Sequence, residues 1–132
     1  MKIGVIGAGA WGTALAQVAA ANGEPVLLWA FEAEVVDAIN QTRCNPLYLP
    51  NIDLSPAIRA TGAIGELASC DAVLVVTPAQ HLGAILADLP DGRYTVILGV
   101  YEWQTGARLS GTDLDSGAQG DLLPLVSFSL FD

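Results

Sequence analysis

Three glycines near the start of the chain have the spacing to hold a phosphate ligand through backbone groups alone. Gly7, Gly9 and Gly12 form a G-x-G-x-x-G run that directly follows a short apolar segment. In such a run the first glycine permits a tight turn, the second leaves room for a pyrophosphate, and the third allows close packing of strand and helix. A helix beginning here offers unpaired N–H groups and partial positive charge to the anion. The run predicts a dinucleotide-binding turn; the alternative is a glycine-rich turn without a ligand.

Glu32 is a candidate for recognising the ribose of such a ligand. It follows the glycine run by about 20 residues, the spacing at which an acidic side chain accepts hydrogen bonds from ribose hydroxyls. Glu32 also begins a predicted helix, where an acid would complement the helix dipole without touching any ligand. The sequence leaves these two interpretations equally open.

Short apolar segments alternate with amphipathic segments around the glycine run. Apolar runs of about four residues bounded by turns are typical of buried parallel strands. We expect strands over residues 3–6, 26–29, 58–61 and 72–76, and helices over residues 13–21, 32–41, 64–68 and 79–89. This order predicts an α/β fold of the Rossmann type, with helices on both faces of a parallel sheet.

The pattern changes after Pro90-Asp91-Gly92, where β-type segments replace the alternation. Residues 126–130 alternate apolar and hydroxyl side chains, as a half-exposed strand does. We therefore expect a dinucleotide-binding domain over residues 1–92 and a β-strand or hairpin extension over residues 93–132, with a turn at 104–106. Residues 95–100 are expected to continue the parallel sheet beside residues 72–76.

The composition limits the partners of this chain. It has 5 Lys and Arg residues against 14 Asp and Glu residues, giving a formal net charge of -9. This balance argues against nucleic acid, whose phosphates need basic side chains, and against an anionic membrane surface. An exposed sheet edge would still allow pairing with a second copy or with a partner chain.

The cysteines and the histidine point to no metal site. Cys44 and Cys70 have no metal-ligand spacing, and His81 is the sole histidine. We expect reduced thiols, as in cytoplasmic proteins. Lys2 and the apolar run after it mimic a secretory signal, but the glycine run interrupts it, so we expect a cytoplasmic protein.

Four segments carry a resemblance to a known family. They are G-A-G-A-W-G-T-A-L at 7–15, V-L-L-W at 26–29, N-P-L-Y-L-P at 45–50 and V-V-T-P-A-Q at 75–80. The aromatic residue inside the glycine run and the Asn-x-x-Tyr-Leu-Pro loop are the selective features. Through these segments residues 1–92 resemble the N-terminal half of bacterial NAD(P)-dependent glycerol-3-phosphate dehydrogenase.

The resemblance implies that the cofactor is NAD or NADP. Ala10 and Trp11 would lie beside its phosphates and ribose, and position 31 would approach the adenosine ribose. The family usually has a basic residue there, able to meet a 2′-phosphate, and Phe31 removes that reason to prefer NADP. Tyr48 would belong to a loop that closes over the cofactor, or equally would only anchor that loop.

Thr77 and Pro78 would end a strand beside the nicotinamide, according to the same resemblance. The predicted cofactor-binding residues are Gly7, Gly9, Ala10, Trp11, Gly12, Phe31, Glu32, Tyr48, Thr77 and Pro78.

The family pattern fails beyond residue 92. An ungapped match places Gly99 where the family has a lysine that contacts cofactor and substrate, and Lys2 is this chain's sole lysine. The family's second catalytic lysine lies in a helical C-terminal domain outside these 132 residues. Reduction of dihydroxyacetone phosphate needs a proton donor and cations for the phosphate. We therefore expect a catalytically incomplete NAD(P)-binding module without catalytic residues.

Two alternatives remain for the function. A partner chain that bears the lysines would complete an active dehydrogenase, or the chain is a non-functional fused fragment. Residues 93–132 favour a fusion, because they resemble a β-rich terminal segment of some bacterial membrane glycosyltransferases. Gly92-x-Tyr94 and Thr105-Gly106-x-Arg108-Leu109 carry that second resemblance.

Overall fold

The computed structural model describes residues 1–98, 100–101, 108–109, 111–112, 119–120 and 123–130. It divides into two units, Met1–Pro90 and Asp91–Asp132. Within the described part, no helix is long and apolar enough to cross a membrane.

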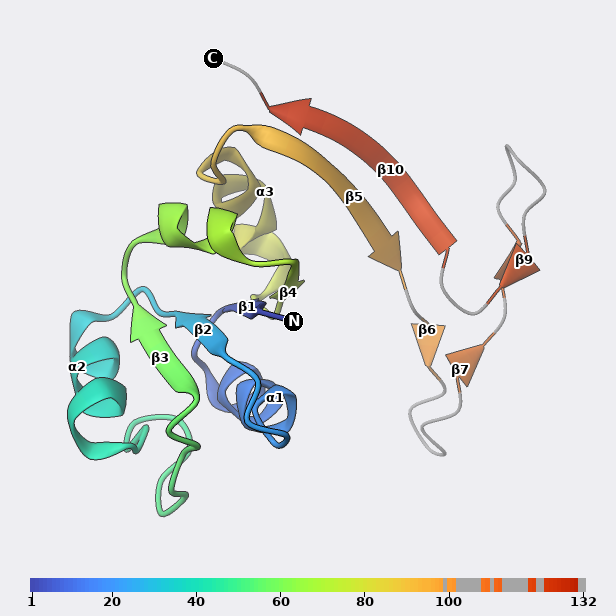
Figure 1. Cartoon of the computed structure of the whole chain (residues 1–132). Coiled ribbons are helices and arrows are strands. Elements are labelled where there is room, and N and C mark those ends of the chain that lie inside the picture. Colours follow the sequence, from blue (N-terminus) through green and yellow to red (C-terminus); the bar gives the residue numbers. More distant parts are fainter. Residues whose placement is uncertain (99, 102–107, 110, 113–118, 121–122, 131–132) are drawn as a thin grey trace. The chain divides into compact units, whose positions relative to one another are not determined.

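The first unit contains a parallel sheet of four short strands (Figure 1). The strands are β1 (Ile3–Ile6), β2 (Val26–Trp29), β3 (Ile58–Thr61) and β4 (Ala72–Val75). Their order in the sheet is β3-β2-β1-β4. The strands fall where the sequence predicts them. β1 and β2 are apolar at successive positions because both of their faces are buried, whereas β3 has an exposed Arg59 and most of β4 is exposed among the described residues.

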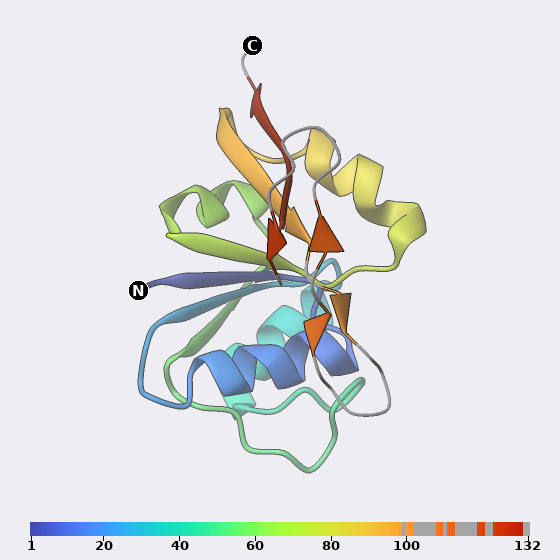
Figure 2. The same cartoon turned by 90° about the vertical axis from the view of Figure 1, so that its right-hand side faces the viewer.

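Helices cover both faces of this sheet. They are α1 (Ala10–Ala19), α2 (Ala33–Thr42), the 3-10 helix η1 (Ile64–Ser69) and α3 (Ala79–Ala87). Figure 2 shows α1 and α2 on one face and η1 with α3 on the other. The predicted Rossmann-type arrangement is confirmed. Helix α1 begins inside the glycine run rather than at Thr13, because Gly9 itself is its extended N-cap residue.

The core is divided by the sheet, and successive strand residues face opposite sides. Val5 and Leu28 belong to the cluster beneath α1 and α2, whereas Ile6 and Leu27 belong to the cluster beneath η1 and α3. All four side chains are at most 1% exposed. Both faces of β1 and β2 are therefore buried, which fixes the ends of these strands and the turns that follow them.

The second unit consists of antiparallel pairs in its described residues. Strand β5 (Gly92–Leu98) pairs with β10 (Leu123–Leu130), in a register that sets Val96 opposite Val126. The short pairs are β6 (Val100–Tyr101) with β7 (Arg108–Leu109), and β8 (Gly111–Thr112) with β9 (Gln119–Gly120).

The prediction that residues 95–100 extend the parallel sheet is wrong for the described strands. The hydrogen-bonded neighbour of β5 is β10, and β4 is the last strand of the four-stranded sheet. The strand predicted at 126–130 extends over residues 123–130 and is therefore long enough to pair with the whole of β5. The predicted turn at 104–106 lies outside the described residues.

Candidate functional site

The carboxyl ends of β1, β2 and β4 lie at the same edge of the sheet. The parallel register sets Ile6 opposite both Trp29 and Val75, the last residues of the neighbouring strands. The chain passes from β1 to β2 and β3 on one side, and then returns to β4 on the other side. Such a reversal opens a crevice at the strand ends, where open α/β sheets bind ligands.

The first and third glycines are required by the backbone of the turn itself. Gly7 has a φ of 107°, which side chains disfavour, and a Cβ there would lie 2.7 Å from the carbonyl oxygen of Val76. A Cβ on Gly12 would lie 1.7 Å from the carbonyl oxygen of Gly7, and its nearest contact on β1 would be Val5 Cγ1 at 3.8 Å. The lack of a side chain at Gly12 thus allows α1 to lie close to the glycine turn. It matters less for the contact between α1 and β1.

The second glycine, Gly9, is not required by the backbone of the turn. Gly9 has an extended conformation with a φ of -68°, and a Cβ there would find no atom of the described residues within 4 Å beyond its own chain neighbours. The space beside Gly9 opens into a groove that this residue lines. The lack of a side chain at position 9 therefore leaves room for something other than the protein itself.

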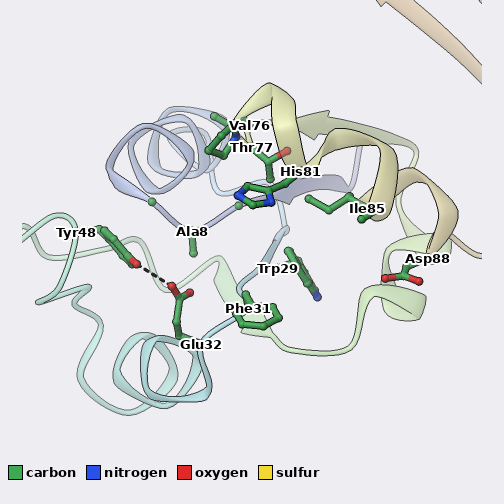
Figure 3. Close-up of a pocket in the computed structure, with 14 residues that line it drawn as sticks. Ala8, Trp29, Phe31, Glu32, Tyr48, Val76, Thr77, His81, Ile85 and Asp88 are labelled. Carbon is green, nitrogen blue, oxygen red and sulfur yellow. Dashed lines mark hydrogen bonds between the residues drawn. The ribbon is translucent and has the colours of Figure 1, made fainter.

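The groove has a volume of about 710 Å³ and lies at the strand ends (Figure 3). Its lining residues come from the glycine turn, the segments after β2 and β4, the 43–51 loop and α3: Gly7, Ala8, Gly9, Trp29, Phe31, Glu32, Tyr48, Val76, Thr77, Pro78, His81, Ala84, Ile85 and Asp88. Seven of the predicted site residues are thus brought together: Gly7, Gly9, Phe31, Glu32, Tyr48, Thr77 and Pro78.

Three predicted residues do not line the groove. Gly12 is buried beneath the turn, whereas Ala10 is exposed on the first turn of α1. Trp11 is 78% exposed. These positions follow from the start of α1 at Ala10, which turns residues 10 and 11 away from the groove lining.

One wall of the groove was missed by the sequence analysis. His81, Ala84, Ile85 and Asp88 all come from α3 or its C-terminal end. Figure 3 shows His81 and Ile85 on one side of the groove and Trp29 with Phe31 on the other. The four α3 positions have the i, i+3, i+4, i+7 spacing of one helical face. That spacing, placed after a strand end, is the signal that could have found them.

Glu32 and Tyr48 contact one another at one end of the groove. The Tyr48 hydroxyl donates a hydrogen bond of 2.7 Å to Oε1 of Glu32 (Figure 3). This carboxylate raises the pKa of Tyr48 above its ordinary value. Glu32 is the N-cap residue of α2 but makes no side-chain capping hydrogen bond. Its carboxylate therefore adjoins a helix start and also lines the groove, so both interpretations of Glu32 stay open.

Asn45 is a further residue that the sequence did not predict as part of a site. It is fully buried, and its amide donates to the carbonyl oxygen of Ala8 at 2.9 Å and to Oγ1 of Thr13 at 2.8 Å. Tyr48 and Asn45 belong to the same loop, which closes with a bridge between Asn45 and Leu49. The polar Asn45 at the start of the mostly apolar segment 45–50 is the sequence feature that could have indicated its role.

Thr77 has an unusual hydroxyl in this groove. Its Oγ1 is buried and has no hydrogen-bond partner among the described residues. Leaving a buried hydroxyl unsatisfied costs about 1–3 kcal/mol. A polar ligand atom in the groove would remove that cost, so the position suits a bound polar group.

The charge of the groove restricts how an anion could be held. Glu32 and Asp88 line it, and within the described lining no residue is Lys or Arg. A phosphate group would therefore rely on backbone N–H groups of the glycine turn and on the N-terminal end of α1.

Comparison with known proteins relates the chain to one family. Residues 2–97 match the family described as the NAD-dependent glycerol-3-phosphate dehydrogenase N-terminus. A protein of Erythrobacter litoralis named glycerol-3-phosphate dehydrogenase (NAD(P)+) is 50% identical over 97 residues, which are 74% of this chain and 29% of that protein. Its namesake from Caulobacter vibrioides is 59% identical over 85 residues, 64% of this chain and 26% of that protein. The family match extends beyond the boundary predicted near residue 92.

Solved structures agree with this relationship. The crystal structure of glycerol-3-phosphate dehydrogenase from Coxiella burnetii superposes with a TM-score of 0.61 and 34% identity, covering 64% of this chain and 26% of that one. This chain thus spans less than a third of the length of these relatives.

Proposed function

Because the chain belongs to the family of NAD-dependent glycerol-3-phosphate dehydrogenase N-termini, we propose that residues 1–92 are a domain that binds NAD or NADP in the groove. The observation that carries this proposal is the empty space beside Gly9, which the fold does not need and a pyrophosphate would fill. The unpartnered Thr77 hydroxyl and the strand reversal at the groove support it.

The lining residues suggest an orientation for the cofactor. The pyrophosphate lies over Gly9, and the ribose next to it meets the carboxylate of Glu32. The adenine base lies among the apolar faces of Trp29, Phe31 and Ile85, because these side chains offer a wide surface without charge. The side chains of Ala10 and Trp11 do not line the groove, so these residues would contribute only the backbone N–H groups at the start of α1.

The nicotinamide end of the cofactor lies toward Thr77 and Pro78 in this orientation. Thr77 Oγ1 is then available to bind a polar group of the nicotinamide. Bound NAD or NADP supplies a carrier that accepts or donates hydride. In this proposal the groove positions the cofactor and excludes water from it.

NADP is not favoured over NAD in this proposal. A 2′-phosphate would adjoin Phe31, which has no charge, and Glu32, whose carboxylate would repel it. The described groove lining contributes no Lys or Arg that could neutralise the phosphate.

The reaction of the relatives suggests the substrate class. We propose that the groove serves oxidoreduction between sn-glycerol 3-phosphate and dihydroxyacetone phosphate, but that these 132 residues do not complete it. Lys2 is the sole lysine of the chain and does not line the groove, and Gly99 lies outside the described residues. We place the protein in the cytoplasm, where Cys44 and Cys70 would remain the free thiols that they are here.

A fluorescence titration of the full chain tests the proposal. Trp29 lines the groove, so bound NADH should quench its emission by energy transfer. Saturable quenching by NADH, with competition by NAD, is the expected result. Quenching that rises linearly without saturation would contradict the proposed function.

A further inference from the structure

The Ala8 carbonyl group is held from behind the glycine turn by two buried side chains. Asn45 Nδ2 donates to this oxygen at 2.9 Å, and the Thr13 hydroxyl donates to it at 3.2 Å. Asn45 and Thr13 are 0% exposed, and they are also hydrogen-bonded to each other at 2.8 Å. These three contacts form a closed triangle beneath the turn.

Fixing this carbonyl also fixes the N–H group of Gly9. The Ala8–Gly9 peptide unit is planar and trans, so its C=O and N–H bonds point in opposite directions. With the oxygen of Ala8 held in the protein interior, the N–H group of Gly9 is directed away from that interior. Gly9 lines the groove, which therefore receives this donor.

The same asparagine also orders the loop that carries Tyr48. Asn45 Oδ1 accepts a hydrogen bond of 3.3 Å from the backbone N–H of Tyr48, and its backbone oxygen accepts one of 2.9 Å from the N–H of Leu49. One buried side chain thus connects the glycine turn with the loop that reaches Glu32.

We propose that Asn45, together with Thr13, is a positioning residue for dinucleotide binding. It holds the Ala8–Gly9 peptide with its N–H toward the pyrophosphate and keeps the Tyr48 loop beside the groove. Neither Asn45 nor Thr13 lines the groove, so both act through the backbone of the turn. This inference rests on the proposed binding of NAD or NADP.

The test compares Asn45→Ala with a matched control in the full chain. Asn40 makes a similar pair of hydrogen bonds to the backbone, donating to Ala60 O at 3.0 Å and accepting from Ala60 N at 2.9 Å, away from the groove. Asn45→Ala should weaken NADH binding by about tenfold or more. Asn40→Ala should lower the melting temperature but leave the Kd for NADH unchanged. Equal Kd values for the two variants would overturn the inference.

A crystal structure of ligand-free Asn45→Ala provides a readout that does not depend on the cofactor. We expect the Ala8–Gly9 peptide to rotate away from its orientation in the parent protein. An unchanged peptide would overturn the inference even if NADH binding were weakened. Failure of the parent itself to bind NADH would instead contradict the proposed function, and the peptide orientation would still decide the role of Asn45.

A second pair of variants applies if Asn45→Ala does not fold. Thr13→Val removes the hydroxyl with little change in volume, whereas Thr13→Ser retains it. We expect weaker NADH binding in Thr13→Val and affinity close to that of the parent in Thr13→Ser. The same affinity in both variants would overturn the inference.

Discussion

The hydroxyl of Tyr48 donates a 2.7 Å hydrogen bond to the carboxylate of Glu32, joining the 43–51 loop to the N-cap of α2. Both residues line the groove and both were candidates for cofactor contacts from the sequence. This hydrogen bond restrains both side chains. A ribose hydroxyl that binds Glu32 must share this acceptor with Tyr48.

The Glu32 carboxylate should control the ionisation of Tyr48. Its hydrogen bond raises the pKa of the phenol, so the contact is fully present below the ordinary tyrosine pKa and is lost as pH rises through the raised one. Glu32→Gln should lower the pKa of Tyr48. The ¹³C NMR signal of the Tyr48 ring, assigned with Tyr48→Phe, measures this. An identical pKa in the parent and in Glu32→Gln would contradict the prediction.

Replacing Gly9 should separate ligand binding from folding. Gly9→Val places its side chain in the groove, where its Cβ meets no described protein atom within 4 Å, so it should abolish NADH binding while costing at most about 1 kcal/mol through a poorer N-cap. Gly12→Ala is the opposite control, because its Cβ meets Gly7 O at 1.7 Å and the fold must yield. Fluorescence titration and thermal melting measure both effects. If Gly9→Val binds NADH as tightly as the parent, the cofactor site lies elsewhere.

NADPH should not bind more tightly than NADH. Phe31 offers no charge to a 2′-phosphate, and Glu32 repels one. Phe31→Arg should therefore improve affinity for NADPH much more than for NADH. Parallel titrations with both reduced cofactors measure this, and a tenfold preference of the parent protein for NADPH would show that another cation reaches the ribose.

The 132-residue protein should not reduce dihydroxyacetone phosphate. Positioning of the nicotinamide alone leaves the developing alkoxide without a donor. The decrease of NADH absorbance measures turnover, and Gly9→Val purified in the same way reports any contaminating host enzyme. Robust turnover in the parent that disappears in Gly9→Val would mean that a residue of this chain replaces the family's lysine.

Deleting residues 107–132 should lower solubility. The deletion removes β10, the antiparallel partner of β5, and leaves the backbone groups on that side of β5 unpaired. Centrifugation after concentration and a melting curve compare the two proteins. A truncated protein as soluble and heat-stable as the full chain would show that the removed strands contribute nothing to the fold.

The sequence by itself determined the elements of the first unit and the geometry of its glycine turn. The strands over 3–6 and 26–29 follow from apolar runs, because a residue's burial on a two-faced sheet depends mainly on its own hydrophobicity. The need for Gly12 follows from sterics within six residues of chain, and the positive φ of Gly7 belongs to the same local turn, but the close approach of Gly7 to Val76 depends on the tertiary structure. The pairing partner of β5 could not be derived in this way, because strand pairing depends on contacts between segments that are far apart in the sequence.

Only the tertiary structure decided which side chains meet in the groove. Tyr48 and Glu32 are 16 residues apart, and Asn45 and Ala8 are 37 residues apart. Local periodicity reports which face of an element is buried, but not which side chain another element brings to it. The sheet sets the ends of β1, β2 and β4 at one edge. The groove residues of α3 and the hydrogen bond from Asn45 to the Ala8 carbonyl depend on this arrangement. Long-range packing thus brought together the groove around a glycine turn that the sequence already predicted.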